Sequence, residues 1–296
     1  MSFSLPLRPL AVSAVLAATL GLSACGSGGS SSGDSSAATL PPDIQTRAEL
    51  GCAGVAGTLD GLQTTLANSL TSGLSGQPAV AATTAQLTAL VNDVLDLVDA
   101  TAGGAASLQA LSSGGDPQLV APVLDQLLCV TAAAGEILLS VTIAASTPVA
   151  DRVELNGLLD TIVDLQAQLS TALGQIAAGG AGGPVAGILQ QVTNTLSGVL
   201  SSPLGLTSLP GGGVVAGVLA PASDLLFDVS GSFGLLQGGD EQGFADALLG
   251  SVTHLVDGLV ASLGPLGVVL TPVLNLLSPV VALLSQLLAG LLGIAL

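Results

Sequence analysis

The stretch that decides the fold is residues 249–296, LGSVTHLVDGLVASLGPLGVVLTPVLNLLSPVVALLSQLLAGLLGIAL. Read in sevens, it places an aliphatic residue at two positions of every heptad. The first set is Leu249, Val256, Leu263, Leu270, Leu277, Leu284 and Leu291, and the second is Val252, Leu259, Leu266, Val273, Val280, Leu287 and Ile294. Two stripes three residues apart are typical of helices whose apolar seam is buried in protein, in a partner or in lipid.

Prolines recur at a third heptad position of this stretch, at Pro265, Pro272 and Pro279. Proline disrupts a helix interior but is well placed in a helix's first turn. We therefore expect three short helices, over 249–263, 265–277 and 279–293, with their seams buried against one another and against earlier helices. Membrane insertion is the alternative, because the 39 residues from Gly258 onward carry no charge, whereas a bilayer crossing needs about 20.

The composition predicts an all-α bundle of amphipathic helices with an aromatic-poor core. The chain has 296 residues, of which 49% are hydrophobic, and it has no Trp, no Tyr and only four Phe. Uniform aliphatic cores pack less specifically than cores with large rings, which disfavours a rigid catalytic pocket. No alternation typical of strands competes with the helical spacing.

Glycine and proline divide the folded region. The run Gly-Gly-Ala-Gly-Gly at 179–183 is the clearest internal boundary. We expect an N-terminal helical domain over 41–178 and a C-terminal apolar helical region over 184–296, which are possible subdomains. Within the second region, a short helix over 214–227 is expected to precede a loop over 229–239, and Asp240 to begin the terminal helices.

Residues 1–24 have the plan of a secretory signal peptide, with Arg8 before an apolar run and small residues at the end. The last three of these residues and the next one form Leu22-Ser23-Ala24-Cys25, which resembles the lipobox of bacterial lipoproteins. This resemblance implies cleavage before Cys25, acylation of that residue with chains such as palmitate, and, because Gly26 follows, transport to the outer membrane. The protein is then anchored on the periplasmic face or the cell surface.

Residues 25–40 are expected to form the lipidated cysteine and a tether. Between 26 and 39 the chain is Gly, Ser, Ala and Thr with a single Asp34, a composition that cannot bury enough surface to fold. A flexible chain of this length has an r.m.s. reach of roughly 20 Å. The tether therefore holds the folded region just off the membrane.

Charge excludes one class of partner. The chain has no Lys, only Arg8, Arg47 and Arg152, and 20 acidic residues, for a net charge of −17. Without cations to neutralise phosphates, nucleic-acid binding is not expected. Anionic headgroups would repel the protein, so lipid contact beyond the anchor would have to be apolar.

Cysteine parity predicts a disulfide. With Cys25 acylated, Cys52 and Cys129 remain in an oxidising compartment, and an even remainder implies a pair. Two buried free thiols are the alternative. Metal ligation is not expected, because no His or carboxylate stands at ligand spacing from either cysteine.

Two side-chain patterns resemble sites of chemistry without meeting its requirements. Ser251, His254 and Asp257 lie along one helix face, but no sharp turn exposes the serine and no oxyanion hole is evident. The carboxylates at 93, 96 and 99 and at 160 and 164 lack an EF-hand spacing, which disfavours Ca²⁺. We expect no catalytic residue, no metal, no cofactor and no enzyme activity.

The Leu/Val/Gly-rich region from 40 to 296 resembles low-complexity surface proteins of Gram-negative bacteria, a likeness of composition that brings no functional residues. We expect a non-enzymatic outer-membrane lipoprotein whose apolar helical surface has structural or interaction roles in the envelope, such as self-association. The alternative is a carrier that holds a hydrophobic small molecule or lipid between amphipathic helices.

Overall fold

The computed structural model of the chain describes residues 42–52, 54, 56–77, 80, 81, 83–106, 108, 117–143, 147, 149–178, 185–202, 211–266 and 270–292. Across these ranges all regular structure is helical, which confirms the all-α bundle. The helices are α1 Arg47–Leu50, α2 Asp60–Leu74, α3 Thr84–Gly103, α5 Ala121–Ile143, α6 Val149–Ala177, α7 Val185–Ser201, α8 Gly212–Gln237, α9 Glu241–Leu263 and α10 Thr271–Leu292, with the 3-10 turns η1 Pro117–Val120 and η3 Gly264–Leu266.

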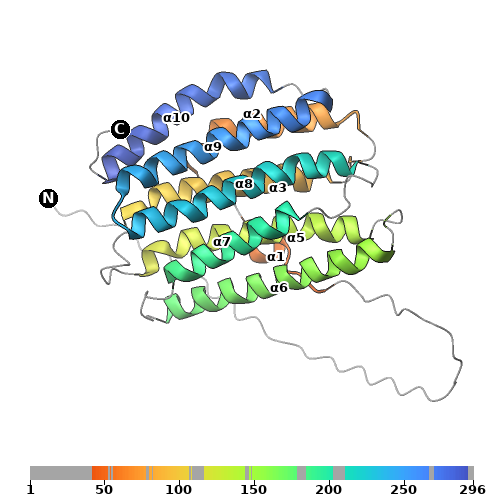
Figure 1. Cartoon of the computed structure of the whole chain (residues 1–296), viewed down its shortest axis with the longest axis horizontal. Helices are drawn as coiled ribbons and strands as arrows, with labels where there is room; N and C mark the ends of the chain where they lie inside the picture. The colour runs from red at the N-terminus through yellow and green to blue at the C-terminus, as the bar shows by residue number, and fades with distance from the viewer. Residues whose placement is uncertain are drawn as a thin grey trace, which may run out of the picture. The chain divides into compact units, whose positions relative to one another are not determined.

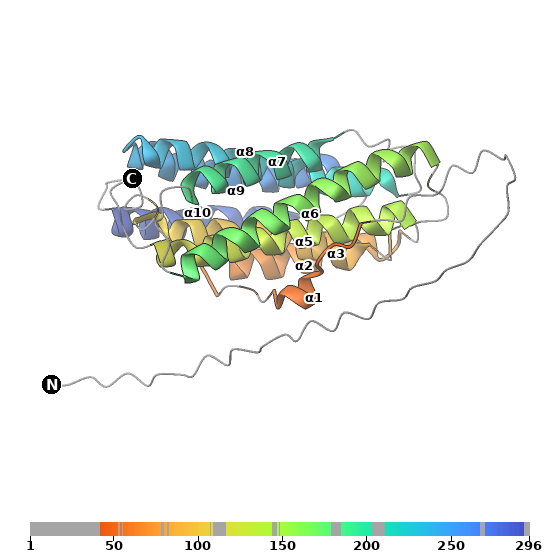
Figure 2. The same ribbon diagram turned by 90° about the horizontal axis from the view of Figure 1, so that it is seen from below.

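The long helices run side by side in two layers (Figures 1 and 2). One layer contains α7, α8 and α9, and the other contains α2, α3 and α5. The edges are closed by α6, which packs between α5 and α7, and by α10, which packs between α9 and α2. The short helix α1 rests on α5. The bundle therefore has α6 at one edge and α10 at the other.

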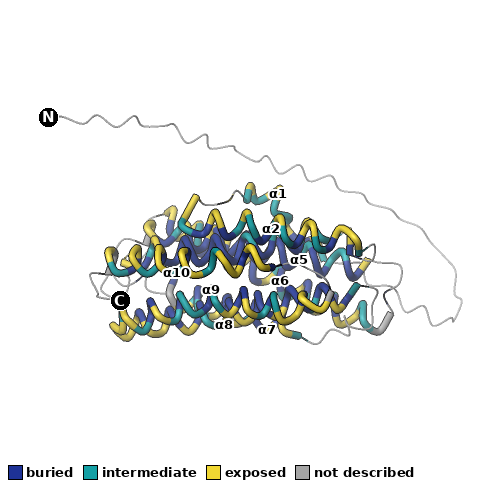
Figure 3. Tube along the Cα trace, turned by 90° about the horizontal axis from the view of Figure 1, so that it is seen from above, coloured by how far each residue is buried: buried dark blue, intermediate teal, exposed yellow. Residues whose placement is uncertain are grey.

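Helix α3 is the centre of the bundle, in contact with α2, α5, α8, α9 and α10. Its apolar residues Leu87, Leu90, Val94 and Val98 are fully buried, as expected from their helical spacing. Figure 3 shows buried residues lining the space between the layers and exposed residues on the outside. Because α3 is covered nearly all round, its polar residues are also buried, and these form part of the first candidate site.

Close backbone contact brings α8 and α9 together. A Cβ atom added at Gly258 would lie 2.9 Å from the ring of Pro221, and one added at Gly217 would lie 3.2 Å from Ser262. Glycine at these positions lets the two helices approach more closely than larger residues would allow. The pair therefore forms the most tightly packed part of its layer.

The expectation of separate helices over 265–277 and 279–293 is wrong, because α10 runs from Thr271 to Leu292 with Pro279 inside it. Proline cannot donate to the carbonyl four residues earlier, which belongs to Asn275. Both residues are exposed, so water can replace the missing donor. The helix therefore continues through Pro279, and it begins at Thr271 with Pro272 in its first turn, where proline is well placed.

The expectation of a loop over 229–239 is also wrong, because α8 continues to Gln237. Val229, Phe233 and Leu236 are buried at helical spacing, and their packing outweighs the low helix propensity of Gly231 and Gly234. The next start signal is confirmed: the Asp240 side chain accepts a hydrogen bond from Gly243 N at 2.8 Å and caps α9.

Residues 39–296 form one compact unit. The gap at 179–184 lies outside the described residues, with α6 ending at Ala177 and α7 beginning at Val185. Helices from both sides of this gap are in contact, since α6 packs on α7 and α3 packs on α8. The division into regions 41–178 and 184–296 stays a prediction about the sequence.

Candidate functional site

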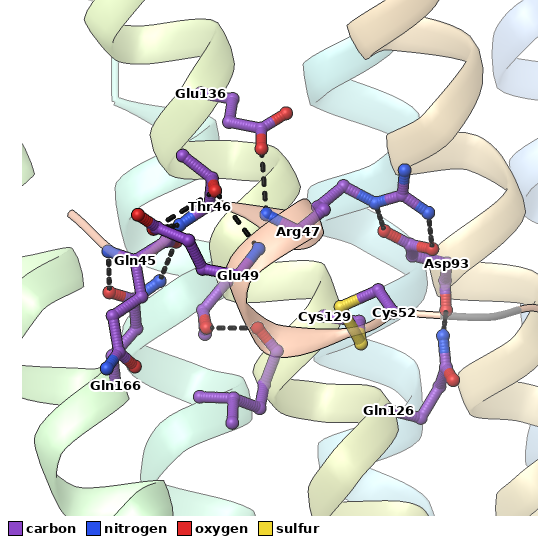
Figure 4. The surroundings of a disulfide bond; sticks show 12 residues. Gln45, Thr46, Arg47, Glu49, Cys52, Asp93, Gln126, Cys129, Glu136 and Gln166 are labelled. Carbon is purple, nitrogen blue, oxygen red and sulfur yellow. Dashed lines mark hydrogen bonds and ion pairs between the residues drawn. A yellow bond between two sulfur atoms is a disulfide. The ribbon is translucent and has the colours of Figure 1, made fainter. Parts of the chain in front are cut away.

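The first candidate site is the attachment of the N-terminal segment to the bundle, drawn in Figure 4. Cys52, just after α1, is bonded to Cys129 of α5, with the two Cα atoms 5.7 Å apart. This is the pair that cysteine parity predicts. The disulfide holds the start of the folded region against α5.

An ion pair fixes the same segment to α3. Arg47 donates from Nε to Asp93 Oδ2 at 2.6 Å and from Nη2 to Asp93 Oδ1 at 2.8 Å. The Arg47 backbone N–H donates to Glu136 Oε1 of α5 at 2.8 Å. The hydrogen bond to Asp93 raises the pKa of Arg47, and burial raises the pKa of Asp93 although Arg47 acts to lower it.

A pair of glutamines extends the attachment to α6. Gln45 N donates to Gln166 Oε1 at 3.0 Å, and Gln166 Nε2 donates back to Gln45 O at 2.8 Å. One side-chain amide thus satisfies both backbone groups of a residue that belongs to no helix. The chain therefore enters the bundle at α5 and α6.

Asp99 of α3 binds the turn before α2. Thr58 N donates to Asp99 Oδ1 at 3.2 Å and Leu59 N donates to Oδ2 at 2.9 Å. A Cβ at Gly57 would overlap the Asp99 carboxyl group, so this close approach requires glycine. Burial raises the pKa of Asp99 to about 6, although the two amide hydrogen bonds act to lower it.

The three aspartates of α3 therefore accept hydrogen bonds from other parts of the protein. Asp96, between the other two, accepts from Gln63 Nε2 at 2.5 Å. Their spacing of three is typical of a solvated helix face, whereas Asp93 and Asp96 are 2% exposed and Asp99 is 7% exposed. Among the described residues, no group of three or more His, Cys, Asp or Glu could hold a metal ion.

The structure does not bring Ser251, His254 and Asp257 together. Ser251 is fully buried and its hydroxyl donates to Leu248 O at 2.8 Å within α9. The His254 ring is exposed and its Nδ1 lies 2.9 Å from Asp228 Oδ2 of α8. This histidine–aspartate contact between helices was missed at the sequence level.

The second candidate site is the outward side of α10, which we call the α10 face. It consists of the exposed residues Thr271, Pro272, Leu274, Asn275, Ser278, Pro279, Ala282, Leu283, Gln286, Leu287 and Gly290. The leucines are 42%, 54% and 37% exposed, in sequence order. The helix carries no charge, and the adjacent α2 has only Asp60 at its start. The α10 face is therefore apolar and neutral on a strongly acidic protein.

The inward side of α10 forms the buried seam, with Val273, Val280, Leu284 and Leu288 packed inside the bundle. In the part of the chain that the structure describes, four helices are long and apolar enough to cross a membrane by length and composition, within 118–143, 212–237, 241–263 and 271–290. Their most apolar windows are 78%, 67%, 44% and 22% buried. Helix α10 thus combines the highest hydropathy of the four with the least burial.

An open groove of about 380 Å³ lies between α6 and α7. Its lining includes Asp164, Gln168 and Gln175 together with Ala172 and Ile188. A groove this open to solvent does not enclose a hydrophobic molecule in the way that an apolar binding cavity does.

Residues 1–24, Cys25 and the rest of the segment 25–40 lie outside the described residues, so the signal peptide, the lipidation and the tether stay predictions. Comparison with known proteins finds no match among protein-family models, curated proteins or solved structures. Because the comparisons point to no site, the candidates come from the structure alone. They are the attachment of the N-terminal segment and the α10 face.

Proposed function

We propose that this protein is a non-enzymatic lipoprotein of the bacterial outer membrane that presents the α10 face as an apolar binding surface. The observation that carries the proposal is the exposure of Leu274, Leu283 and Leu287 on an uncharged helix, although the chain has a net charge of −17. Exposed apolar patches rimmed by polar residues mark interaction sites.

The attachment site supports a tethered arrangement. A chain anchored through Cys25 enters the bundle beside α5 and α6, where the disulfide, Arg47 and Gln45 are bound. Helix α10 closes the other edge, next to α9 and α2 (Figure 1). The described part of the N-terminal segment therefore binds at α5 and α6, away from the edge formed by α10.

Anchoring is tested by replacing the acylated cysteine in the full-length chain. Cys25→Ser is expected to abolish incorporation of radiolabelled palmitate and to leave an unprocessed precursor, because acylation precedes cleavage in lipoproteins with this motif. The matched control is Ser23→Ala, which keeps the cysteine. Palmitate labelling of Cys25→Ser equal to that of the parent chain would refute lipidation at this residue.

The binding surface is tested by retention of the mature protein on a phenyl-bearing resin. Leu283→Glu on α10 is expected to reduce retention strongly, because a charge in the centre of the α10 face must be desolvated on binding. The matched control is Phe227→Glu on α8, where an apolar residue is 65% exposed outside that face. Equal loss from the two variants would show that the α10 face has no special role.

A further inference from the structure

The exposed residues of α10 are arranged symmetrically about a point between Val280 and Val281. Each has an exposed counterpart at the same separation on the other side, except Pro272, whose counterpart Ala289 is half-buried. The pairs are Thr271 with Gly290, Leu274 with Leu287, Asn275 with Gln286, Ser278 with Leu283, and Pro279 with Ala282. Two antiparallel copies of a helix bring such counterparts together.

From this pattern we propose that the α10 face binds a second copy of the chain, with the two α10 helices antiparallel about a two-fold axis at their centre. The inference rests on the proposed function, because it takes the α10 face as the binding surface. It adds the partner and the register. Leu274 meets Leu287 and Asn275 meets Gln286, whereas Leu283 meets Ser278.

The neutral polar residues of the α10 face favour a second copy over the interior of a bilayer. Asn275 and Gln286 each carry amide donors and an acceptor, and both are exposed. Hydrocarbon offers these groups no partner, and each unsatisfied group costs several kilocalories per mole in lipid. In the antiparallel dimer the two amides lie opposite each other and can exchange hydrogen bonds.

Charge distribution also suits self-association. Two copies of a protein with net charge −17 repel each other on most surfaces. The α10 face brings no charge into the contact, and the neighbouring helix α2 has a single charged residue, Asp60 at its start. A contact made by α10 alone therefore buries no acidic group, whereas α9 on its other side carries Glu241, Asp246 and Asp257.

The dimensions predict a weak dimer in solution that forms readily on a membrane. At 1.5 Å per residue α10 is about 33 Å long, and a single helix face roughly 12 Å wide gives roughly 400 Å² per copy. Standard interfaces bury about 800 Å² per partner. Confinement of both copies to one membrane surface by their lipid anchors raises their local concentration, which favours dimerisation there.

Cysteine cross-linking of the full-length lipidated protein in neutral liposomes tests this register. An Ala282→Cys variant places its two thiols about 4.5 Å apart along the helix axes, across helices about 8–10 Å apart. A bis-maleimide of about 10 Å span is therefore expected to produce dimers. Gly290→Cys places them about 28 Å apart along the axes, and Asn194→Cys lies on the exposed side of α7, so neither is expected to cross-link.

A second variant checks that the dimer depends on the α10 face. Leu283→Glu in the Ala282→Cys background is expected to lower the cross-linked fraction about tenfold or more, because the contact must desolvate two glutamates that lie about 7.5 Å apart along the helix axes and repel each other. Phe227→Glu in the same background is expected to leave it unchanged. Both substitutions are at exposed positions, so the bundle itself is not disturbed.

Three results would overturn the dimer. Absence of cross-linking in the Ala282→Cys variant refutes it, and equal cross-linking in the Ala282→Cys and Gly290→Cys variants refutes the antiparallel register. Protection of the thiol introduced by Ala282→Cys from a membrane-impermeant maleimide assigns the α10 face to the bilayer. If cross-linking fails while retention on the phenyl resin still depends on Leu283, the dimer is wrong and the apolar binding surface stands.

Discussion

Arg47 holds Asp93 through two hydrogen bonds, Nε to Oδ2 at 2.6 Å and Nη2 to Oδ1 at 2.8 Å, although 46 positions separate the residues. The Asp93 side chain is 3% exposed and that of Arg47 is 27% exposed. The charge of Asp93 is thus buried and neutralised by a residue in the first turn of the folded region. Removing Arg47 would leave that charge in the core without its cation.

Arg47→Ala is therefore expected to lower the free energy of unfolding by about 3 kcal/mol, the lower end for breaking a buried pair, because Arg47 is partly exposed. Urea unfolding followed by far-UV circular dichroism measures this, since the chain has no Trp or Tyr. The double variant Arg47→Met/Asp93→Leu removes both charges and is expected to lose less. A double variant as unstable as Arg47→Ala would show that the buried charge is not the cause.

The Cys52–Cys129 disulfide closes a loop with a sequence separation of 77. On the chain-entropy model, a cross-link over such a loop stabilises the folded state by about 4 kcal/mol, because it restricts the unfolded chain. Cys52→Ala/Cys129→Ala is expected to lose about that much in urea unfolding. Dithiothreitol should destabilise the parent protein similarly and leave the double variant unaffected. An unchanged urea midpoint of the parent protein under reducing conditions would contradict this prediction.

The raised pKa of Asp99 predicts that the folded protein is more stable in mild acid than at neutral pH. Its folded-state pKa of about 6 lies above the ordinary value of 3.8, so the folded protein binds an extra proton between about pH 4 and 6. The stabilisation that this group gives is fully present below about pH 4 and is lost as the pH rises through 6. The shift corresponds to at most about 3 kcal/mol, and screening by water reduces it.

Asp99→Asn removes this titration and is expected to flatten the dependence of the urea midpoint on pH between 4 and 6. Asp93 and Asp125 act in the same direction, because burial raises the pKa of both. Asp246→Asn, at an exposed position on α9, is the matched control and should keep the parent slope. A slope unchanged in Asp99→Asn would show that another group causes it.

The all-α fold class could be predicted from the sequence because it depends on the spacing of apolar residues within each helix. Leucine and valine at intervals of three and four place α3 and α9 with buried apolar faces, and Asp240 marks a helix start by its capping side chain. The cysteine pairing followed from setting Cys25 aside as the acylated residue, which leaves two cysteines. Each of these signals lies in a few neighbouring residues or in a simple count.

Long-range contacts between polar groups could not be predicted in this way. Nothing local to Arg47 indicates Asp93, and the interval of three between Asp93, Asp96 and Asp99 is also typical of a solvated helix face. The difference arises because the second half of α3 is covered nearly all round and the N-terminal segment lies over its acidic row. The one available signal for this contact was that Arg47 is a lone arginine at the start of an acidic folded region.

The heptad pattern predicted the buried seam of α10 but misplaced one of its residues. A straight α-helix drifts by about 20° per heptad relative to a strict seven-residue repeat. The buried set accordingly passes from Val273 and Val280 to Leu284 and Leu288, and Leu287, expected in the seam, is 37% exposed. This drift contributes one of the three exposed leucines of the α10 face.

Substitutions at two adjacent leucines of α10 can distinguish a helix whose seam is buried in protein from a helix surrounded by lipid. Leu284 is fully buried and Leu283 is 54% exposed. In the folded bundle, Leu284→Ala is expected to lower the free energy of unfolding by about 2–5 kcal/mol through a lost side chain and a cavity. Leu283→Ala is expected to change it by less than about 0.5 kcal/mol, as surface substitutions usually do. A helix surrounded by hydrocarbon would lose similar apolar contact at either position. Urea unfolding of both variants in neutral detergent therefore decides between the two environments, and equal losses at 283 and 284 would refute the buried seam.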